Sequence, residues 1–258
     1  MNSLNLKNIT ENLLDTFLHA GSIAKEISRK GVKITIKTDK SPVTDGDLAV
    51  DKILSEKISS LTPNIPIVSE ETVNLKIKNN NQDFWLIDPI DGTKDYIKKK
   101  DEYTLNAALI INSEPSIGIV YAPEKRRLFY SYGKNLAFEI FNGNKKILDC
   151  KKKKAGEITA LVNSDKTPGS ILEIYKKNKV SKIVKMSSSL KFCILAAGEA
   201  DIYAAQARAY EWDIAAGHAI LEHAGGKVTT HNHKKFFYGK NDYKNLAIVA
   251  RRGENLEK

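Results

Sequence analysis

Residues 85–93 read Trp85-Leu86-Ile87-Asp88-Pro89-Ile90-Asp91-Gly92-Thr93 and join an apolar run to two carboxylates. The apolar run is typical of the end of a buried strand. Pro89 has no backbone N–H to donate, so neither a strand ladder nor a helix is expected to continue through it. The sequence therefore predicts a turn at a strand end, with Asp88 and Asp91 on the turn.

The polar residues of this stretch suit a metal site beside a bound phosphate. Hard divalent cations prefer several oxygen ligands in a small volume, and Asp88, Asp91 and the carbonyl of Ile90 supply them from one bend. Gly92 allows the backbone close to a ligand, and Thr93 adds a hydroxyl. For Asp91-Gly92 alone, an ordinary turn with a carboxylate bonded to its own backbone is the favoured interpretation. The complete pattern favours the metal site.

Two further acidic segments flank this stretch. Residues 65–71 form a short apolar strand that ends in Glu70 and Glu71, either of which alone would more often be a solvated loop carboxylate. Residues 211–221 open a helix that ends at Gly225-Gly226, and Asp213 falls near its first turn. Taken alone, Asp213 is a helix cap or an acid that offsets the helix dipole. The metal-ligand interpretation gains weight because the other acids exist.

The chain resembles the inositol monophosphatase superfamily and, within it, the 3′(2′),5′-bisphosphate nucleotidases. The matching segments span most of the chain: Ser41-Pro42-Val43-Thr44-Asp45-Gly46-Asp47, Val68-Ser69-Glu70-Glu71, residues 85–96, Ser188-Ser189-Leu190-Lys191-Phe192-Cys193 and residues 212–218. The superfamily signature is the specific part. The nucleotidase assignment depends on the shorter motifs at residues 41–44, 93–96 and 189–193.

The resemblance implies an α/β (α+β layered) fold, the five-layer α-β-α-β-α sandwich of this superfamily. Apolar periodicity predicts an amphipathic helix over Leu4–Lys30 and a second helix over Leu48–Leu61. Strands are expected at 32–37, 106–112, 117–121, 128–132, 159–162 and 182–186, and helices near 169–178 and 190–197. The lysine run 151–154 suggests a connection between an N-terminal lobe, residues 1–154, and a C-terminal lobe, residues 155–258.

The resemblance also implies a role for each matching residue. The ligands of two core Mg²⁺ ions would be Glu70, Asp88, the Ile90 carbonyl, Asp91 and Asp213. Asp47 and Thr93 would orient the attacking water, with Asp47 as the base, and Glu70 would belong to the same catalytic set. The backbone amides of Gly92 and Thr93 would hold the phosphate. Glu71 would lie outside the direct ligands and contact a water on the metal.

Substrate contacts are expected from Ser188, Lys191 and Arg208, together with Glu70, Ile90, Asp91, Gly92, Thr93 and Asp213. The alternative is that the serines at 187–189 cap a helix and that Lys191 is solvated. Two features depart from the nucleotidase pattern. Residues 204–207 lack an arginine that relatives carry, so that Arg208 remains, and Ser187 replaces a glycine. Either change would loosen recognition of a 5′-phosphate.

The net charge of +10 raises the question of nucleic-acid binding. Lysine supplies most of it and is dispersed along the chain, with short runs at 98–100 and 151–154. A solvated lysine-rich surface is therefore favoured, and no nucleic-acid partner is expected. No apolar run is long enough for an integral membrane segment, so a cytoplasmic location is predicted, with peripheral association at the inner membrane left open. Cys150 and Cys193 are expected to be reduced thiols.

The predicted function is that of a Mg²⁺-dependent phosphatase. It would remove the 3′-phosphate from 3′-phosphoadenosine 5′-phosphate to give AMP, a reaction tied in the resembling family to sulfur assimilation and lithium inhibition. Whether the sulfated nucleotide is also a substrate, and whether the protein is a monomer or a homodimer, stay open. One alternative is an inositol monophosphatase or another small phosphate monoesterase on the same fold. A second is an inert nucleotide- or RNA-binding module, against which the complete acidic set argues.

Overall fold

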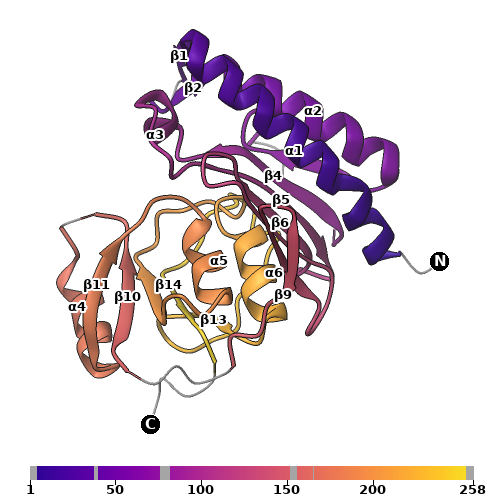
Figure 1. Ribbon diagram of the computed structural model, residues 1–258. Helices are drawn as coiled ribbons and strands as arrows, with labels where there is room; N and C mark the ends of the chain where they lie inside the picture. Colours follow the sequence, from indigo (N-terminus) through magenta and orange to yellow (C-terminus); the bar gives the residue numbers. More distant parts are fainter. Residues whose placement is uncertain (1–4, 38–39, 76–81, 152–155, 165, 254–258) are drawn as a thin grey trace.

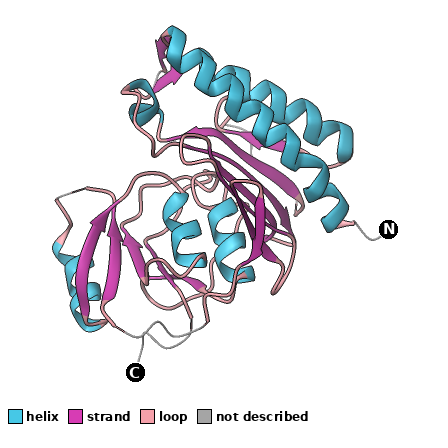
Figure 2. Ribbon diagram, in the orientation of Figure 1, coloured by secondary structure: helices cyan, strands magenta, loops and turns pink. Residues whose placement is uncertain are grey.

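The computed structural model describes residues 5–37, 40–75, 82–151, 156–164 and 166–253, and its elements stack in five layers (Figure 1). Helices α1 (Leu6–Lys30) and α2 (Asp45–Leu61) cover one face of a seven-stranded sheet. Helices α5 (Leu190–Ala196) and α6 (Ala215–His223) lie between that sheet and a five-stranded sheet, whose outer face α4 (Gly169–Lys177) covers. Figure 2 shows the alternation of helix and strand layers. The predicted α-β-α-β-α sandwich is confirmed.

The outer helix pair forms where its apolar residues were expected. Helix α1 buries Leu13, Phe17, Ala20 and Ala24, which lie on one face at helical spacing. Helix α2 begins at Asp45 rather than at the predicted Leu48, and a short hairpin of β1 (Ile34–Ile36) and β2 (Pro42–Thr44) precedes it. Thr44 and a carboxylate three residues on form a capping box that starts the helix early.

The large sheet is antiparallel except for its first pair of strands, which is parallel. Its strand β4 is buried on both faces: Phe84 and Leu86 pack toward α5 and α6, whereas Trp85 and Ile87 pack toward α1 and α2. Burial on both faces explains the unbroken apolar run in the sequence. The strands follow the chain in order: β3 (Ile67–Ser69), β4 (Phe84–Asp91), β5 (Thr104–Ile111), β6 (Glu114–Ala122), β7 (Arg127–Ser131), β8 (Ala137–Phe141) and β9 (Asn144–Ile147).

The prediction that Pro89 ends the strand was wrong. Strand β4 continues to Asp91, and its register with β5 shifts between Asp88, opposite Asn106, and Asp91, opposite Thr104. A proline is tolerated within a sheet at such an irregularity, because the ladder needs no donor there. Asp88 and Asp91 therefore both pair with β5, one on each side of the irregularity.

The smaller sheet is mixed, in the order β11-β10-β12-β14-β13. Its strands are β10 (Ile158–Val162), β11 (Val180–Lys185), β12 (Ile202–Ala205), β13 (Lys227–Thr230) and β14 (Ile248–Arg251). Helix α6 packs tightly on the large sheet: a Cβ added at Gly118 of β6 would lie 2.3 Å from the Ala216 carbonyl oxygen. This close approach is possible because Gly118 has no side chain.

The helix that contains Ala216 was expected to open at residue 211, with Asp213 near its first turn. It begins later than expected, and Asp213 lies just before its first turn. Helix α6 begins at Ala215, with Ile214 as an N-cap that makes no side-chain hydrogen bond. Asp213 lies in the preceding turn, where its Oδ2 accepts a hydrogen bond from the Tyr210 amide at 2.8 Å. This local bond competes with helix formation.

The predicted lobe boundary at 154/155 and most of the lysine run 151–154 lie outside the described residues. The division into lobes 1–154 and 155–258 therefore stays a prediction. Cys150 and Cys193 are buried free cysteines. Within the described ranges, no helix is long and apolar enough to cross a membrane.

Candidate active site

Three carboxylates from separate segments converge at the edge of the large sheet. Glu70 follows β3, Asp88 lies in β4 and Asp213 precedes α6, and one oxygen from each lies within 4.8 Å of the other two. Parallel pairing of β3 with β4 aligns the first two, since the Glu70 amide donates to the Ile87 carbonyl at 3.1 Å. The sequence-predicted acids from distant positions are therefore neighbours in space.

These carboxylates fit a divalent cation. Asp88 is 1% exposed, and its Oδ1 has no hydrogen-bond partner among the described residues. Burial, and then the neighbouring carboxylates, hold the pKa of Asp88 and of Asp213 well above the usual range. Buried acids that repel one another need a positive charge among them, and an all-oxygen donor set suits a hard ion such as Mg²⁺.

Asp91 lies beside this group but is fixed by the segment that precedes α5. Its Oδ2 accepts a hydrogen bond from the Ser189 amide at 2.5 Å. Burial raises the pKa of Asp91 to about 6, against the opposing charge of Lys191. Asp91 lines the same open cleft of about 570 Å³ as Glu70 and Asp88.

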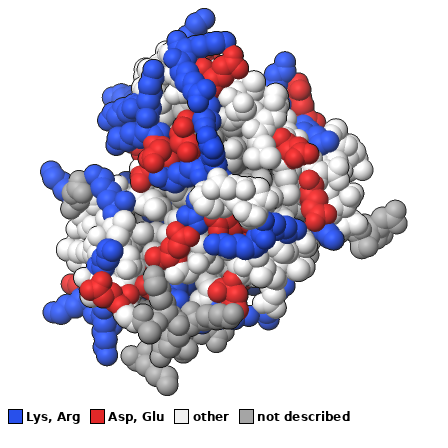
Figure 3. All heavy atoms as spheres, in the orientation of Figure 1, with Lys and Arg blue, Asp and Glu red and all other residues white. Residues whose placement is uncertain are grey.

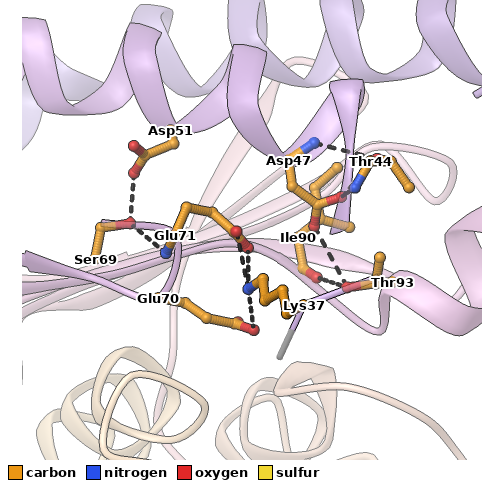
Figure 4. Close-up of polar contacts among 9 residues, drawn as sticks. All are labelled: Lys37, Thr44, Asp47, Asp51, Ser69, Glu70, Glu71, Ile90 and Thr93. Atoms are coloured by element: carbon orange, nitrogen blue, oxygen red, sulfur yellow. Dashed lines mark hydrogen bonds and ion pairs between the residues drawn. The ribbon is translucent and has the colours of Figure 1, made fainter. Parts of the chain in front are cut away.

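The expected pair of Asp47 and Thr93 is brought together (Figure 4). The Thr93 hydroxyl lies 3.3 Å from Asp47 Oδ1 and 3.1 Å from the Ile90 carbonyl oxygen. The other Asp47 oxygen accepts from the amide and the hydroxyl of Thr44, at 2.8 and 2.5 Å. Burial raises the pKa of Asp47, while the bonds from Thr44 oppose the shift. The capping box of α2 thus fixes this carboxylate.

Gly92 precedes the short helix α3 (Thr93–Ile97) and has φ +94°, a left-handed conformation that glycine adopts without strain. It lines the cleft together with Ile90, Asp91 and Thr93. The turn after β4 is therefore shaped to bring backbone groups close to a ligand, as its sequence suggested.

Lys37 at the end of the β1–β2 hairpin was not predicted to be near the site. Its Nζ lies 3.2 Å from Glu70 Oε1 and 2.8 Å from Glu71 Oε2, between the two carboxylates (Figure 4). Burial raises the pKa of Glu71 to about 7, although Lys37 opposes the shift. No spacing in the sequence links residue 37 to residues 70 and 71, so only the fold reveals this contact.

Lys191 of α5 is 4% exposed, so the alternative that it is solvated was wrong. Its ammonium donates to the Ser188 carbonyl and lies 5.0 Å from the centre of the Tyr203 ring. Burial lowers the pKa of Lys191 to about 8, against the attraction of Asp91. The alternative was that the serines cap this helix. Ser189 does occupy the N-cap position of α5, but its side chain makes no cap hydrogen bond.

A pocket of about 220 Å³ joins these groups. Asp91, Asp213, Ser188, Lys191 and Arg208 all line it. Arg208 also lines the open cleft and an adjoining cavity of about 110 Å³. The lining also includes neutral residues that the sequence did not single out, among them Asn163, Tyr203, Asn245 and Leu246.

Lysines surround the mouth of the open cleft, at positions 94, 98, 100 and 185. Figure 3 shows that the Lys and Arg side chains on this face of the molecule are interspersed with Asp and Glu side chains. The positive groups of the cleft mouth and the buried carboxylates therefore lie in one site. This combination attracts an anionic ligand while leaving oxygen donors for a cation.

Comparison with known proteins agrees with this geometry. The sequence profile of the inositol monophosphatase family matches residues 5–258. The chain is 42% identical over 205 residues to the 3′(2′),5′-bisphosphate nucleotidase CysQ of Buchnera aphidicola subsp. Acyrthosiphon pisum (strain APS), covering 79% of this chain and 76% of that protein. It is 34% identical over 200 residues to the CysQ nucleotidase of Salmonella typhimurium strain LT2, covering 77% and 80%.

A solved structure gives the same result. The crystal structure of CysQ from Bacteroides thetaiotaomicron, described as a bacterial member of the inositol monophosphatase family, superposes with a TM-score of 0.79. The match covers 98% of this chain and 100% of that chain, at 28% sequence identity.

Proposed function

Because this chain belongs to the inositol monophosphatase family, we propose that it is a 3′(2′),5′-bisphosphate nucleotidase. The reaction is hydrolysis of the 3′-phosphate of 3′-phosphoadenosine 5′-phosphate, with AMP and phosphate as products. The named function of the sequence relatives supports this substrate, and the solved structure with the same fold is also named CysQ.

The observation that carries the proposal is the pocket of about 220 Å³ that both acids and cations line. Asp91 and Asp213 suit the reacting phosphate and its cation, whereas Lys191 and Arg208 suit a second phosphate. A buried lysine that faces a polar pocket loses hydration, and an anionic ligand restores its interactions. A substrate with two phosphates uses both halves of the pocket.

Magnesium is the ion we propose for the acidic group, with Glu70, Asp88, Asp91, Asp213 and the Ile90 carbonyl as ligands. The orphaned Asp88 Oδ1 and the convergence of the buried carboxylates support this assignment. When bound, such ions neutralise the phosphoryl charge that would repel the nucleophile. Glu71 and Lys37 lie just outside these ligands.

The chain's own residues then position and deprotonate water. Asp47 is the proposed base, and Thr93 is placed to hold the attacking water through its hydroxyl, which already contacts Asp47 Oδ1. Gly92 and Thr93 offer backbone amides to the phosphate oxygens. Attack of water on phosphorus breaks the bond to the 3′-oxygen, which leaves as the hydroxyl of AMP after taking up a proton.

The inositol monophosphatase alternative is less supported, because the sequence relatives described above are named as nucleotidases and a buried cation adjoins the acids. The inert-module alternative does not explain a complete set of carboxylates around an orphaned oxygen. A cytoplasmic location, the absence of a nucleic-acid partner, the two-lobe division and a monomer or homodimer remain parts of the proposal. Action on the sulfated nucleotide and lithium inhibition belong to the same proposal.

Product analysis tests this assignment. The protein is incubated with 3′-phosphoadenosine 5′-phosphate and Mg²⁺, and the nucleoside products are separated by ion-exchange chromatography. The proposal predicts AMP, with no adenosine 3′-phosphate, and no reaction after chelation by EDTA. Adenosine 3′-phosphate as the main product would mean that the 5′-phosphate occupies the acidic end of the pocket, contrary to the proposal.

A further inference from the structure

The loop before α5 is held in place by two carboxylates from the segment between β4 and β5. The Ser187 amide donates to Glu102 Oε2 at 2.8 Å, and the Ser187 hydroxyl donates to Asp95 Oδ2 at 2.5 Å. Asp95 lies in α3, and Glu102 follows that helix just before β5. Both acceptors therefore come from the metal-ligand side of the site, whereas Ser187 belongs to the substrate-contact segment.

The same loop is anchored on its other side. The Ser189 amide donates to Asp91, and the Ser189 hydroxyl lies 2.5 Å from Asn106 Oδ1 and 2.9 Å from Thr104 Oγ1. Hydrogen bonds to residues 91–106 thus flank Ser188 on both sides.

Ser188 itself adopts an unfavourable backbone conformation. Its φ is +56°, in the left-handed region that a residue with a side chain rarely occupies. In this conformation its carbonyl accepts a hydrogen bond from the Lys191 ammonium. A strained residue persists when its surroundings fix it, and here the flanking bonds of Ser187 and Ser189 do so.

We propose that Asp95 and Glu102 are positioning residues that set specificity for the second phosphate. By holding Ser187, they fix Ser188 and the Lys191 ammonium at a set distance from Asp91, so that the two phosphates of one substrate meet both halves of the pocket. The proposal rests on the nucleotidase function proposed above. Neither carboxylate has a place in the reaction itself, and the serine at position 187 gives Asp95 a hydroxyl donor that glycine would lack.

The two carboxylates have a physical reason to act chiefly on binding of the second phosphate. Asp95 follows Thr93 by two residues in α3, but its side chain bonds to Ser187 and Lys100. The Glu102 side chain accepts from the Ser187 amide. Among the described residues, neither side chain hydrogen-bonds to Asp47 or Thr93. Their removal frees the loop to relax from the strained Ser188 conformation. The Lys191 ammonium then loses its fixed distance from Asp91, while the metal-binding carboxylates keep their own hydrogen bonds.

The test compares two substrates that share the 3′-phosphate and differ in the 5′-phosphate. The kcat and KM values for 3′-phosphoadenosine 5′-phosphate and for adenosine 3′-monophosphate are measured for the wild type, Asp95→Ala, Glu102→Ala and Ser187→Ala. We expect each variant to lose about tenfold in the ratio of kcat/KM between the bisphosphate and the monophosphate, chiefly through KM. Asp95→Asn and Glu102→Gln keep an acceptor oxygen and should recover most of that ratio.

Asp101→Ala is the matched control, because Asp101 lies between the two carboxylates in sequence and pairs with Lys125 on the surface. Thermal unfolding of each variant shows that the fold is retained. Equal losses on both substrates, or an unchanged ratio in Asp95→Ala and Glu102→Ala, would overturn the positioning role. A wild-type protein without any preference for the bisphosphate would instead contradict the proposed function, and the positioning role with it.

Discussion

Asp88 is the residue on which the site depends most, because it is a buried carboxyl without a hydrogen-bond partner for one oxygen among the described residues. Its neighbours Glu70, Asp91 and Asp213 add negative charge to the same volume. In the absence of a cation, this cluster opposes folding at neutral pH. Function and stability are therefore in conflict at this residue, and a cation bound as proposed would resolve the conflict.

The first prediction concerns the stability of the metal-free protein. In the folded state, the pKa values of Asp88 and Asp213 are raised, and that of Asp91 rises from 3.8 to about 6. Between the ordinary pKa of these carboxyl groups and their raised values, the folded state therefore binds more protons than the unfolded state. Stability should therefore fall as pH rises through the raised values. Asp88→Asn should stabilise the metal-free protein at pH 7.5 by about 1–3 kcal/mol. Urea unfolding in EDTA measures this difference.

Addition of Mg²⁺ provides the complementary measurement. The wild type should gain thermal stability with Mg²⁺ at pH 7.5, and Asp88→Asn should lose most of that gain. Asp101→Asn, at an exposed carboxylate, serves as the control. An equal Mg²⁺ effect in the wild type and Asp88→Asn would contradict the assignment of Asp88 as a ligand.

The second prediction concerns Thr93. Thr93→Ala should lower kcat by about 10²-fold with little change in KM, because orientation of water matters mainly in the transition state. Thr93→Ser keeps the hydroxyl and should retain most of the activity. Steady-state kinetics with the bisphosphate nucleotide decides, and a change confined to KM would count against the role in water orientation.

Residue patterns identified the acids but not all of their neighbours. The pairs Asp88/Asp91 and Glu70/Glu71 stand beside apolar strands, which is a local signal in the sequence. Lys37 has no such signal, because its contact with Glu70 arises from a hairpin far away in the chain. The burial of Lys191 could not be predicted from neighbouring residues in the sequence, because its ammonium lies over the ring of Tyr203, which belongs to another element.

At the scale of elements, the bulge in β4 and the cap of α2 place the functional groups. The sequence predicted the helices α1, α2, α4 and α5 and the strands β5 to β7, and the amphipathic helix α1 was found from the periodicity of its apolar face. It did not predict β9, whose four residues Asn144–Ile147 are all exposed and show no alternation. Such a strand exists because β8 pairs with it.

The third prediction tests the capping box of α2. Thr44→Ala removes the donor to Asp47 and the acceptor for the Gly46 and Asp47 amides. We expect a loss of about 1–2 kcal/mol in the free energy of unfolding, typical of a lost N-cap. The kcat should also fall, because Asp47 is no longer fixed. Thr44→Ser should keep both properties, and normal kcat in a destabilised Thr44→Ala protein would separate the cap from catalysis.

At the scale of the whole molecule, the site lies where the two sheets and their shared helix layer meet. The acids come mainly from the large sheet, whereas Lys191 and Arg208 belong to the part of the chain that builds the smaller sheet. Hydrogen bonds of Ser187 and Ser189 cross between these parts. Binding of a substrate that contacts both parts therefore depends on their relative position.

The fourth prediction concerns Lys191, at the centre of this junction. Lys191→Met keeps the apolar stem in the core and removes the charge, which avoids the cavity that alanine would leave. We expect kcat/KM for 3′-phosphoadenosine 5′-phosphate to fall by about 10²-fold, and that for adenosine 3′-monophosphate to change far less. Parallel kinetics on the two substrates provide the test. Equal losses would mean that Lys191 does not bind the second phosphate.

The most direct measurement of the central claim is phosphate release from 3′-phosphoadenosine 5′-phosphate and from inositol 1-phosphate, each with Mg²⁺ and with added lithium. The account predicts fast, lithium-sensitive release from the nucleotide and slow release from inositol 1-phosphate. A preference for inositol 1-phosphate would contradict the nucleotidase assignment while leaving the fold and the metal ligands intact.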